Sequence, residues 1–169
     1  MELDMKKIKE VIAEAERIGM YVMLDMHDYC RRNVDGVTCK ISDSGKLTKE
    51  HLADVWKKIA VECQMYKNIW GYDIMNEPYG LDKGVWYSTA QAVIDAIRTV
   101  DMQTPIVIEG ESYASSSTWP STGGGLIGLN DPAHNKDILA EKQTICKENQ
   151  KKKRIFFRAE ERMCLSEKS

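Results

Sequence analysis

The chain alternates three amphipathic segments with three short apolar ones, and this order constrains its fold more than any other feature. The amphipathic segments carry apolar residues at helical spacing and cover residues 8–18, 52–63 and 86–97. Each is followed by a β-prone stretch, namely YVMLDM at 21–26, IWGYDIM at 69–75 and IVI at 106–108. Helices and strands in strict alternation are typical of a parallel sheet covered by helices. The sequence therefore predicts an α/β fold with parallel strands.

Length and charge narrow the classes of protein to which the chain can belong. Its 169 residues fit one domain of ordinary size and fall short of the roughly 200–250 residues of a closed eight-stranded β/α barrel. Lysine and arginine number 24 against 26 acidic residues, a balance of −2 that provides no strongly basic surface for nucleic acid. No apolar run approaches the roughly 18 residues of a membrane span. We therefore expect neither nucleic acid nor a membrane among its partners.

The two ends of the chain differ in character from its middle. The first ten residues, MELDMKKIKE, contain no apolar segment typical of a signal peptide, so either the protein stays inside the cell or its true start lies upstream. All 11 glycines, 4 prolines and 4 tryptophans lie at or before Pro132, whereas residues 141–169 carry nine basic and five acidic residues. We therefore predict a folded part at 1–135 and a charged tail at 136–169 that is helical or disordered and lies outside the fold.

Polar side chains follow all three predicted strands at the point where each strand ends. They are Asp25, His27 and Asp28 after the first strand, Asn76 and Glu77 after the second, and Glu109 and Glu111 after the third. In parallel α/β proteins, ligands bind beyond the carboxyl ends of the strands. The three strand ends therefore predict one functional site at a shared rim.

Glu77 is the candidate for acid–base chemistry at this rim. It follows an apolar strand and precedes Pro78, which cannot continue the strand ladder and so turns the chain outward. A carboxyl group in a partly apolar pocket has a raised pKa and can act as a general acid near neutral pH. Asn76 could hold a substrate hydroxyl and His27 could orient the substrate. The alternative for Glu77 is a structural carboxylate that caps a helix or forms a salt bridge.

Metal, phosphate and disulfide sites are weaker possibilities. His27 with its neighbouring aspartates could bind a metal ion, although a histidine at a strand end is better explained as a substrate contact. Gly123–Gly125 could form a phosphate loop, but no Lys-Ser or Lys-Thr follows it and no strand immediately precedes it. We therefore expect no metal and no cofactor. The five cysteines show no Cys-x-x-Cys spacing, so free thiols are the default, although Cys30 and Cys39 could form a disulfide in an oxidising compartment.

Three segments resemble successive strands of glycoside hydrolase family 5, the cellulase family. IWGYDIMNEPYG (69–80) resembles the fourth-strand motif, in which Asn-Glu-Pro carries the acid/base glutamate. YVMLDMHDYCRR (21–32) resembles the third strand, and PIVIEGESYASSSTW (105–119) resembles the fifth strand with its loop. The resemblance implies a fragment of a (β/α)8 TIM barrel at 1–135 that hydrolyses β-1,4-glucan with retention of configuration.

The resemblance also implies roles for individual residues. Glu77 would be the proton donor, Asn76 would bind the sugar 2-hydroxyl, and His27 would shape the cleavage subsite. Asp28 would be a sugar contact, although many relatives have asparagine there and a carboxylate can only accept hydrogen bonds. Trp119 would be a stacking platform for a sugar ring, or would pack on the rim of the barrel instead.

The family's second catalytic carboxylate has no counterpart in this sequence. Retaining hydrolysis needs a nucleophile about 5–5.5 Å from the acid/base carboxyl. The family takes it from the seventh strand, and after Asn135 the chain has no His-x-Tyr motif, no strand-like run ending in Glu-Gly and no tryptophan. The family's first two strands and second-strand arginine are also missing. We therefore expect an endoglucanase-type chain whose own activity is lost.

Three further expectations follow from this interpretation. A non-catalytic carbohydrate-binding or interaction protein that retains the rim is the alternative function. A three-stranded parallel piece leaves unpaired sheet edges, through which two copies could associate. The family's substrate is extracellular, so the resemblance implies a secreted protein that acts on a β-glucan polysaccharide or oligosaccharide.

Overall fold

The computed structural model describes residues 2–41, 45–115, 117–118, 121, 124–133, 137–140 and 154–159. Within these residues, the long helices are α1 (Glu2–Arg17), α2 (Lys49–Cys63) and α3 (Val85–Arg98), and a short 3-10 helix, η1, covers Gly124–Gly128. Five strands form the main sheet, β1 (Tyr21–Met26), β4 (Ile69–Asp73), β5 (Ile106–Glu109), β6 (Asp137–Ala140) and β7 (Arg154–Ala159). Two more form a hairpin, β2 (Arg31–Val34) and β3 (Val37–Lys40).

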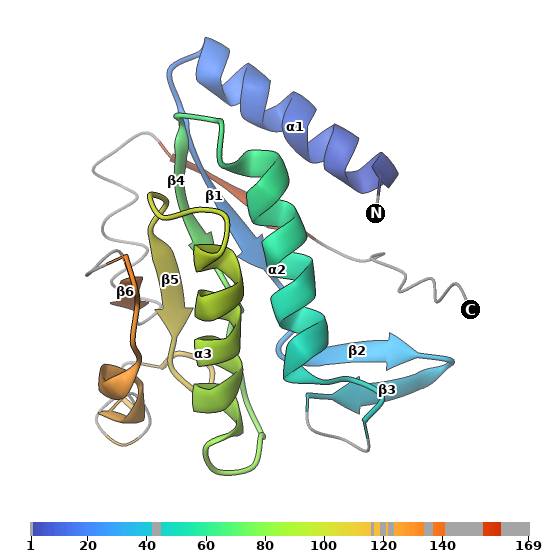
Figure 1. Cartoon of the computed structure of the whole chain (residues 1–169). Helices are drawn as coiled ribbons and strands as arrows, with labels where there is room; N and C mark the ends of the chain where they lie inside the picture. The colour runs from blue at the N-terminus through green and yellow to red at the C-terminus, as the bar shows by residue number, and fades with distance from the viewer. Residues whose placement is uncertain are drawn as a thin grey trace.

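The main sheet is parallel throughout, as the alternation of elements predicts. Its strand order is β6-β5-β4-β1-β7, and every neighbouring pair is parallel. The arrowheads of β1, β4 and β5 point toward the end of the molecule from which the hairpin projects (Figure 1). The three predicted strand ends therefore lie at one edge of the fold.

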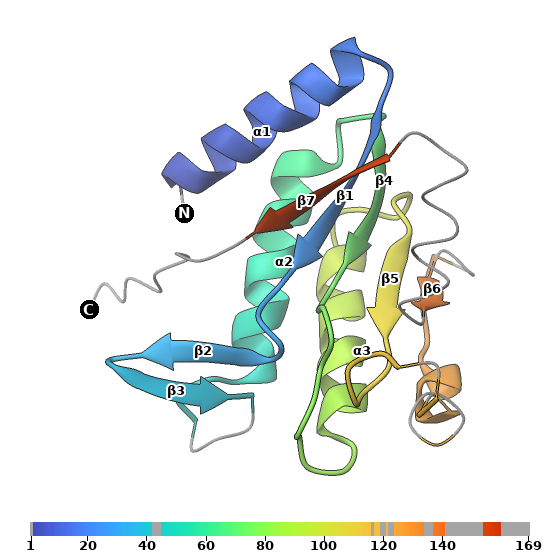
Figure 2. The same ribbon diagram turned by 180° about the vertical axis from the view of Figure 1, so that it is seen from behind.

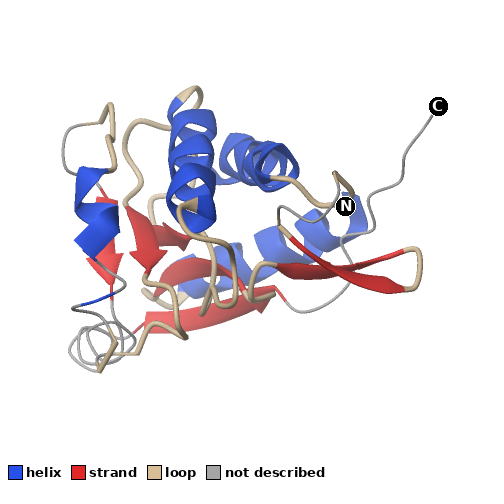
Figure 3. Ribbon diagram, turned by 90° about the horizontal axis from the view of Figure 1, so that it is seen from below, coloured by secondary structure: helices blue, strands red, loops and turns tan. Residues whose placement is uncertain are grey.

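Helices α2 and α3 cover one face of this sheet, as the views from the front and from behind show (Figures 1 and 2). The view from below shows α2 and α3 on one side of the strands (Figure 3). Helix α1 packs against β1 and α2, and Lys9 forms an ion pair with Glu62 between the two helices. None of the described helices is long and apolar enough to cross a membrane.

Two buried tryptophans attach the helices to the ends of the strands. Trp56 on α2 donates its indole N–H to the carbonyl of Ile74 at 2.9 Å, and Trp86 on α3 donates to the carbonyl of Glu109 at 2.8 Å. Each tryptophan is only 1% exposed, so a buried indole N–H finds its partner at a strand end. The apolar stripes that predict the helices therefore also fix the backbone of the candidate site.

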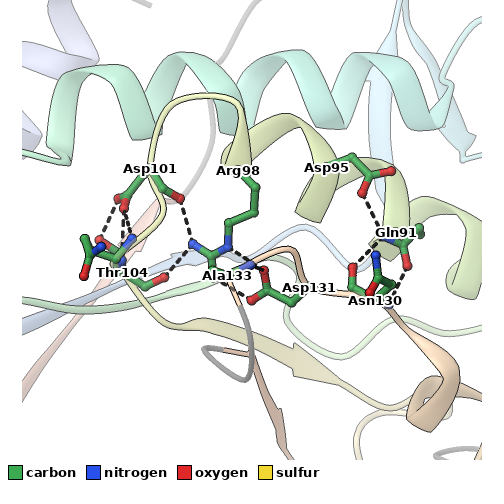
Figure 4. Close-up of polar contacts among 9 residues, drawn as sticks. Gln91, Asp95, Arg98, Asp101, Thr104, Asn130, Asp131 and Ala133 are labelled. Atoms are coloured by element: carbon green, nitrogen blue, oxygen red, sulfur yellow. Dashed lines mark hydrogen bonds and ion pairs between the residues drawn. The ribbon is translucent and has the colours of Figure 1, made fainter.

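A buried ion pair attaches helix α3 to the segment that precedes β6 (Figure 4). The Arg98 guanidinium donates to both carboxylate oxygens of Asp131, at 2.8 and 2.9 Å, and both side chains are 1% exposed. It also donates to the carbonyls of Asp101 and Thr104. Four hydrogen bonds thus compensate a charge that has been removed from water.

The β2–β3 hairpin is not predicted from the sequence, but its turn residues account for it. Asp35 and Gly36 have φ values of +52° and +79°, which are the left-handed conformations of a two-residue turn between twisted strands. Cys30 and Cys39 are buried free thiols, so the disulfide alternative is not formed. Cys39 stands opposite Arg32 in the hairpin, and Cys30 accepts a backbone hydrogen bond from Ile41 instead.

The segment expected to be helical or disordered contains two strands. Residues 137–140 pair with β5, and residues 154–159 pair with β1 from Tyr21↔Arg154 to Met26↔Ala159. Each of these strands occupies an edge that β1 or β5 would otherwise leave with unpaired backbone groups. The outer edges of the described sheet are therefore those of β6 and β7, and the remainder of 136–169 lies outside the described residues.

Candidate active site

The ends of β1, β4 and β5 meet at Asn76 and Glu77. The N–H of Asn76 donates to the carbonyl of Met26 at 2.8 Å, which ties it to the end of β1. The N–H of Glu77 donates to Oε2 of Glu109 at 2.6 Å, which ties it to the end of β5. The structure therefore brings together the three strand ends that the sequence singles out.

Asn76 presents a buried donor to the site. Its residue is 8% exposed, and among the described residues its Nδ2 has no hydrogen-bond partner. A buried amide N–H without a hydrogen-bond acceptor costs free energy. A ligand oxygen that accepts from such a group removes this cost. Asn76 can therefore donate to a hydroxyl placed over the strand ends.

Glu77 has an unusual backbone conformation. Its φ is +46°, in the left-handed region that non-glycine residues seldom adopt. Such conformations are concentrated at functional sites, where the surrounding structure holds them in place. Glu77 is half-buried, and the next residue, Pro78, is buried.

His27 is held between two side chains of its own segment. Its Nδ1 lies 2.8 Å from Oδ2 of Asp25, and its Nε2 lies 3.1 Å from the hydroxyl of Tyr29. Both ring nitrogens therefore have a hydrogen-bond partner within the chain. The ring of His27 is thereby fixed in orientation, and His27 follows Met26, whose carbonyl accepts the N–H of Asn76.

Three carboxyl groups come from neighbouring strands behind the rim: Asp25, Asp73 and Glu109. Burial first, and then the charge of Asp25, raises the pKa of Glu109 to about 8. Burial, followed by the charges of Glu109 and Asp25, raises the pKa of Asp73 well above its usual range. Glu109 and Asp73 therefore hold protons at pH values where surface carboxylates are ionised. No three His, Cys, Asp or Glu side chains in the described ranges are placed to bind one metal ion.

Asp28 and Trp119 are the two remaining residues for which the sequence predicts a sugar contact. Oδ2 of Asp28 accepts from Nη2 of Arg32 at 2.6 Å and from its Nε at 3.2 Å. Burial raises the pKa of Asp28, while the Arg32 charge opposes that rise. The Asp28 carboxylate is therefore engaged within the chain. Trp119 lies outside the described residues.

Sequence reasoning missed an aromatic stack beside Glu77. The rings of Tyr79 and Tyr113 stack with centroids 4.5 Å apart and planes at 22°, and the Arg31 guanidinium lies 3.7 Å over the Tyr79 ring. Because Arg31 and Tyr113 cannot occupy the same face of one ring, Tyr79 lies between them. Tyr113 is 53% exposed, and its N–H donates to the carbonyl of Pro78 at 3.5 Å. The signal was present in sequence, since one tyrosine follows Asn-Glu-Pro and the other follows a strand end.

The segment that carries Tyr113 is strained. Ser112, Tyr113 and Ala114 have φ values of +61°, +64° and +49°, three consecutive left-handed residues without a glycine. Each such residue costs roughly 1–2 kcal/mol relative to a right-handed conformation. Ala114 is fully buried and anchors the turn, which leaves Tyr113 exposed next to the strand ends.

Comparison with known proteins gives one consistent result. The family model "Cellulase (glycosyl hydrolase family 5)" matches residues 2–147, which extends past the boundary at 135 that composition suggests. Endoglucanase 1 of Saitozyma flava is 28% identical over 123 residues, which are 72% of this chain and 35% of that protein.

Solved structures agree with the sequence matches. Endoglucanase Cel5A of Pseudomonas stutzeri superposes with a TM-score of 0.69 at 38% identity, over 80% of this chain and 40% of that one. An endo-β-1,4-glucanase of Xanthomonas axonopodis pv. citri superposes with a TM-score of 0.72 at 26% identity, over 82% and 44% of the two chains. The P. stutzeri enzyme has also been solved in complex with cellobiose. The chain thus spans less than half the length of these relatives.

Proposed function

Because the chain belongs to the cellulase family, glycosyl hydrolase family 5, we propose that its strand-end site binds β-1,4-glucan with Glu77 as the proton donor. Its parallel sheet and helices form part of the family's (β/α)8 barrel. The observation that carries the proposal is the placement of Asn76 and Glu77 between the ends of β1 and β5. Active sites of this fold lie at the carboxyl ends of the strands.

The proposed chemistry divides the work among three side chains. In a retaining reaction, Glu77 would give a proton to the departing glycosidic oxygen while a nucleophilic carboxylate attacks the anomeric carbon, and would then take a proton from the water that releases the sugar. Nδ2 of Asn76 donates to a hydroxyl of the sugar at the cleavage point, consistent with its lack of a partner among the described residues. His27, fixed by Asp25 and Tyr29, borders the same sugar.

Two carboxyl groups at the strand ends, Glu109 and Asp73, are poorly suited to be the nucleophile of that reaction. A nucleophile must be ionised and lie about 5–5.5 Å from the acid/base carboxyl. Glu109 and Asp73 have raised pKa values, and Oε2 of Glu109 already accepts the N–H of Glu77. We therefore propose that this chain alone binds glucan with little or no turnover. A non-catalytic carbohydrate-binding role is the second candidate, and the raised pKa values of Glu109 and Asp73 favour it.

Replacing Glu77 by glutamine tests the two roles together. We expect the chain and its E77Q variant to bind cellooligosaccharides equally and to release reducing ends from carboxymethylcellulose at the same background rate. Both quantities are measured on the full chain, by calorimetry and by a reducing-sugar assay. Turnover that E77Q lowers 10²-fold or more would support the proton-donor role and contradict the missing nucleophile. Absence of any glucan binding by the unmodified chain would refute the proposed function itself.

The exposed face of Tyr113 should contribute to glucan binding. Sugar rings present apolar faces that pack on aromatic rings, and the Tyr79 ring supports Tyr113 from behind. We expect Y113A to weaken cellooligosaccharide binding about tenfold and Y113F to retain it. Tyr21 is the matched control, because it is 49% exposed at the opposite end of β1. Equal losses in Y113A and Y21A would contradict a specific contact.

The proposed substrate also determines the proposed place of action. Cellulose-type glucans lie outside cells, so we propose that the protein acts in the extracellular space. The proposed partner is accordingly a β-glucan polysaccharide or oligosaccharide.

A further inference from the structure

The hydrogen-bond ladder between β4 and β5 changes at the residue before Glu77. Alternate residues of β4 and its extension donate to β5, since the N–H of Ile74 meets the carbonyl of Val107 at 3.1 Å. Continued alternation would place the N–H of Asn76 on the carbonyl of Glu109. Asn76 instead donates to Met26 on the other side. The regular ladder therefore stops one residue before the proposed proton donor.

Glu109 supplies a side-chain contact where the ladder stops. Its carbonyl is engaged by the indole N–H of Trp86 at 2.8 Å, and its carboxylate accepts the N–H of Glu77 at 2.6 Å. The residue is 3% exposed, so the carboxylate is held in place by the surrounding core. A carboxyl oxygen can accept a backbone N–H whether or not the group is ionised, and the bond is stronger when the group is charged.

We propose that Glu109 is a positioning residue, whose carboxylate holds the Glu77 backbone in its left-handed conformation and thereby sets the direction of the Glu77 side chain. The φ of +46° is unfavourable for a glutamate by itself, so it needs a contact that the right-handed alternative would lose. The Glu77 N–H bond to Oε2 is such a contact. The functional meaning of this role rests on the proposed function of Glu77, whereas the bond itself is testable without any glucan.

The first test is amide hydrogen exchange on the full 15N-labelled chain. In E109M, which keeps the volume but removes the acceptor, we expect the Glu77 amide to exchange about 10- to 100-fold faster. The amides of Tyr72 and Ile74, which donate to carbonyls of the β5 side, should keep their protection. D95N, which neutralises a carboxylate on the exposed side of α3, is the control and should leave Glu77 unchanged. Unchanged Glu77 exchange in E109M, or equal acceleration of all three amides, would overturn the proposal.

The second test uses E109Q, which retains an acceptor oxygen and so guards against a failure of E109M to fold. In the unmodified chain the Glu77 amide resonance should shift downfield with a midpoint near pH 8 as Glu109 ionises. The other titratable groups that face this position are Asp25 on β1, with its partner His27, and Asp73 on β4. E109Q should retain most of the protection of Glu77 and lose the step near pH 8. Persistence of that step in E109Q would overturn the proposal.

Discussion

Replacing Arg98 by methionine should lower the free energy of unfolding by about 3–5 kcal/mol. The substitution keeps most of the side-chain volume but removes the cation that Asp131 faces from a 1% exposed position. It leaves the buried Asp131 carboxylate without its positive countercharge and also removes the donors to two loop carbonyls. The loss is therefore expected to exceed that of an ordinary surface ion pair by a wide margin.

Urea denaturation followed by circular dichroism measures this loss. Lys58→Met is the matched control, because Lys58 pairs with Asp54 at 2.5 Å while both side chains are more than half exposed. That variant should cost about 0.3–0.5 kcal/mol. The double variant R98M/D131L should recover part of the stability, because it removes both charges at once. Equal costs for R98M and K58M would contradict the structural role given to the Arg98–Asp131 pair.

The free energy of unfolding should fall as the pH rises from about 4.5 to 8. Glu109 has a folded-state pKa of about 8, raised from the ordinary value of 4.5. Below pH 4.5 the carboxyl is protonated in both states, so its full stabilising contribution is present. Above that pH the unfolded chain ionises first, and stability is lost until the folded state ionises near pH 8. The pKa of Asp73 is raised in the same direction and should add to the effect.

E109Q isolates the contribution of Glu109 to this pH dependence. A neutral amide has no proton to release, so the variant should be more stable than the unmodified chain at pH 8 by an amount of the order of a few kcal/mol. At pH 4.5 the difference should be small, because the carboxyl is then neutral as well. Urea unfolding at pH 4.5, 6 and 8 measures both chains. A parallel pH dependence in the two would show that Glu109 is ionised normally in the folded state.

The composition of residues 136–169 predicts a helix or disorder, and for residues 154–159 this prediction is wrong. Residues 154–159, RIFFRA, stand in a charged context without turn residues, which is typical of a solvated helix or a disordered segment. In the structure they form β7 beside β1. An unpaired edge of a parallel sheet offers backbone groups to any β-prone segment, and that opportunity is invisible in the segment's own sequence.

In the candidate site, too, local patterns identify residues, whereas contacts between distant residues appear only in the structure. His27, Asn76 and Glu77 were identified because each stands at the end of an apolar strand, which is a local pattern. Glu109 was noted at a strand end, but its bond to the N–H of Glu77 joins residues 32 positions apart. The stack of Tyr79 on Tyr113 likewise depends on two separate strand ends.

The sequence by itself determined the order of helices and strands, the parallel sheet and the residues at its carboxyl ends. Those properties follow from periodicity and turn chemistry, which act over a few residues. Only the tertiary structure decided which carboxyl holds the Glu77 backbone, which tyrosine supports the exposed Tyr113 and which aspartate pairs with Arg98. These pairings join residues that are far apart in the chain. The free energy of burying polar groups selects them, and it leaves no pattern in the neighbouring sequence.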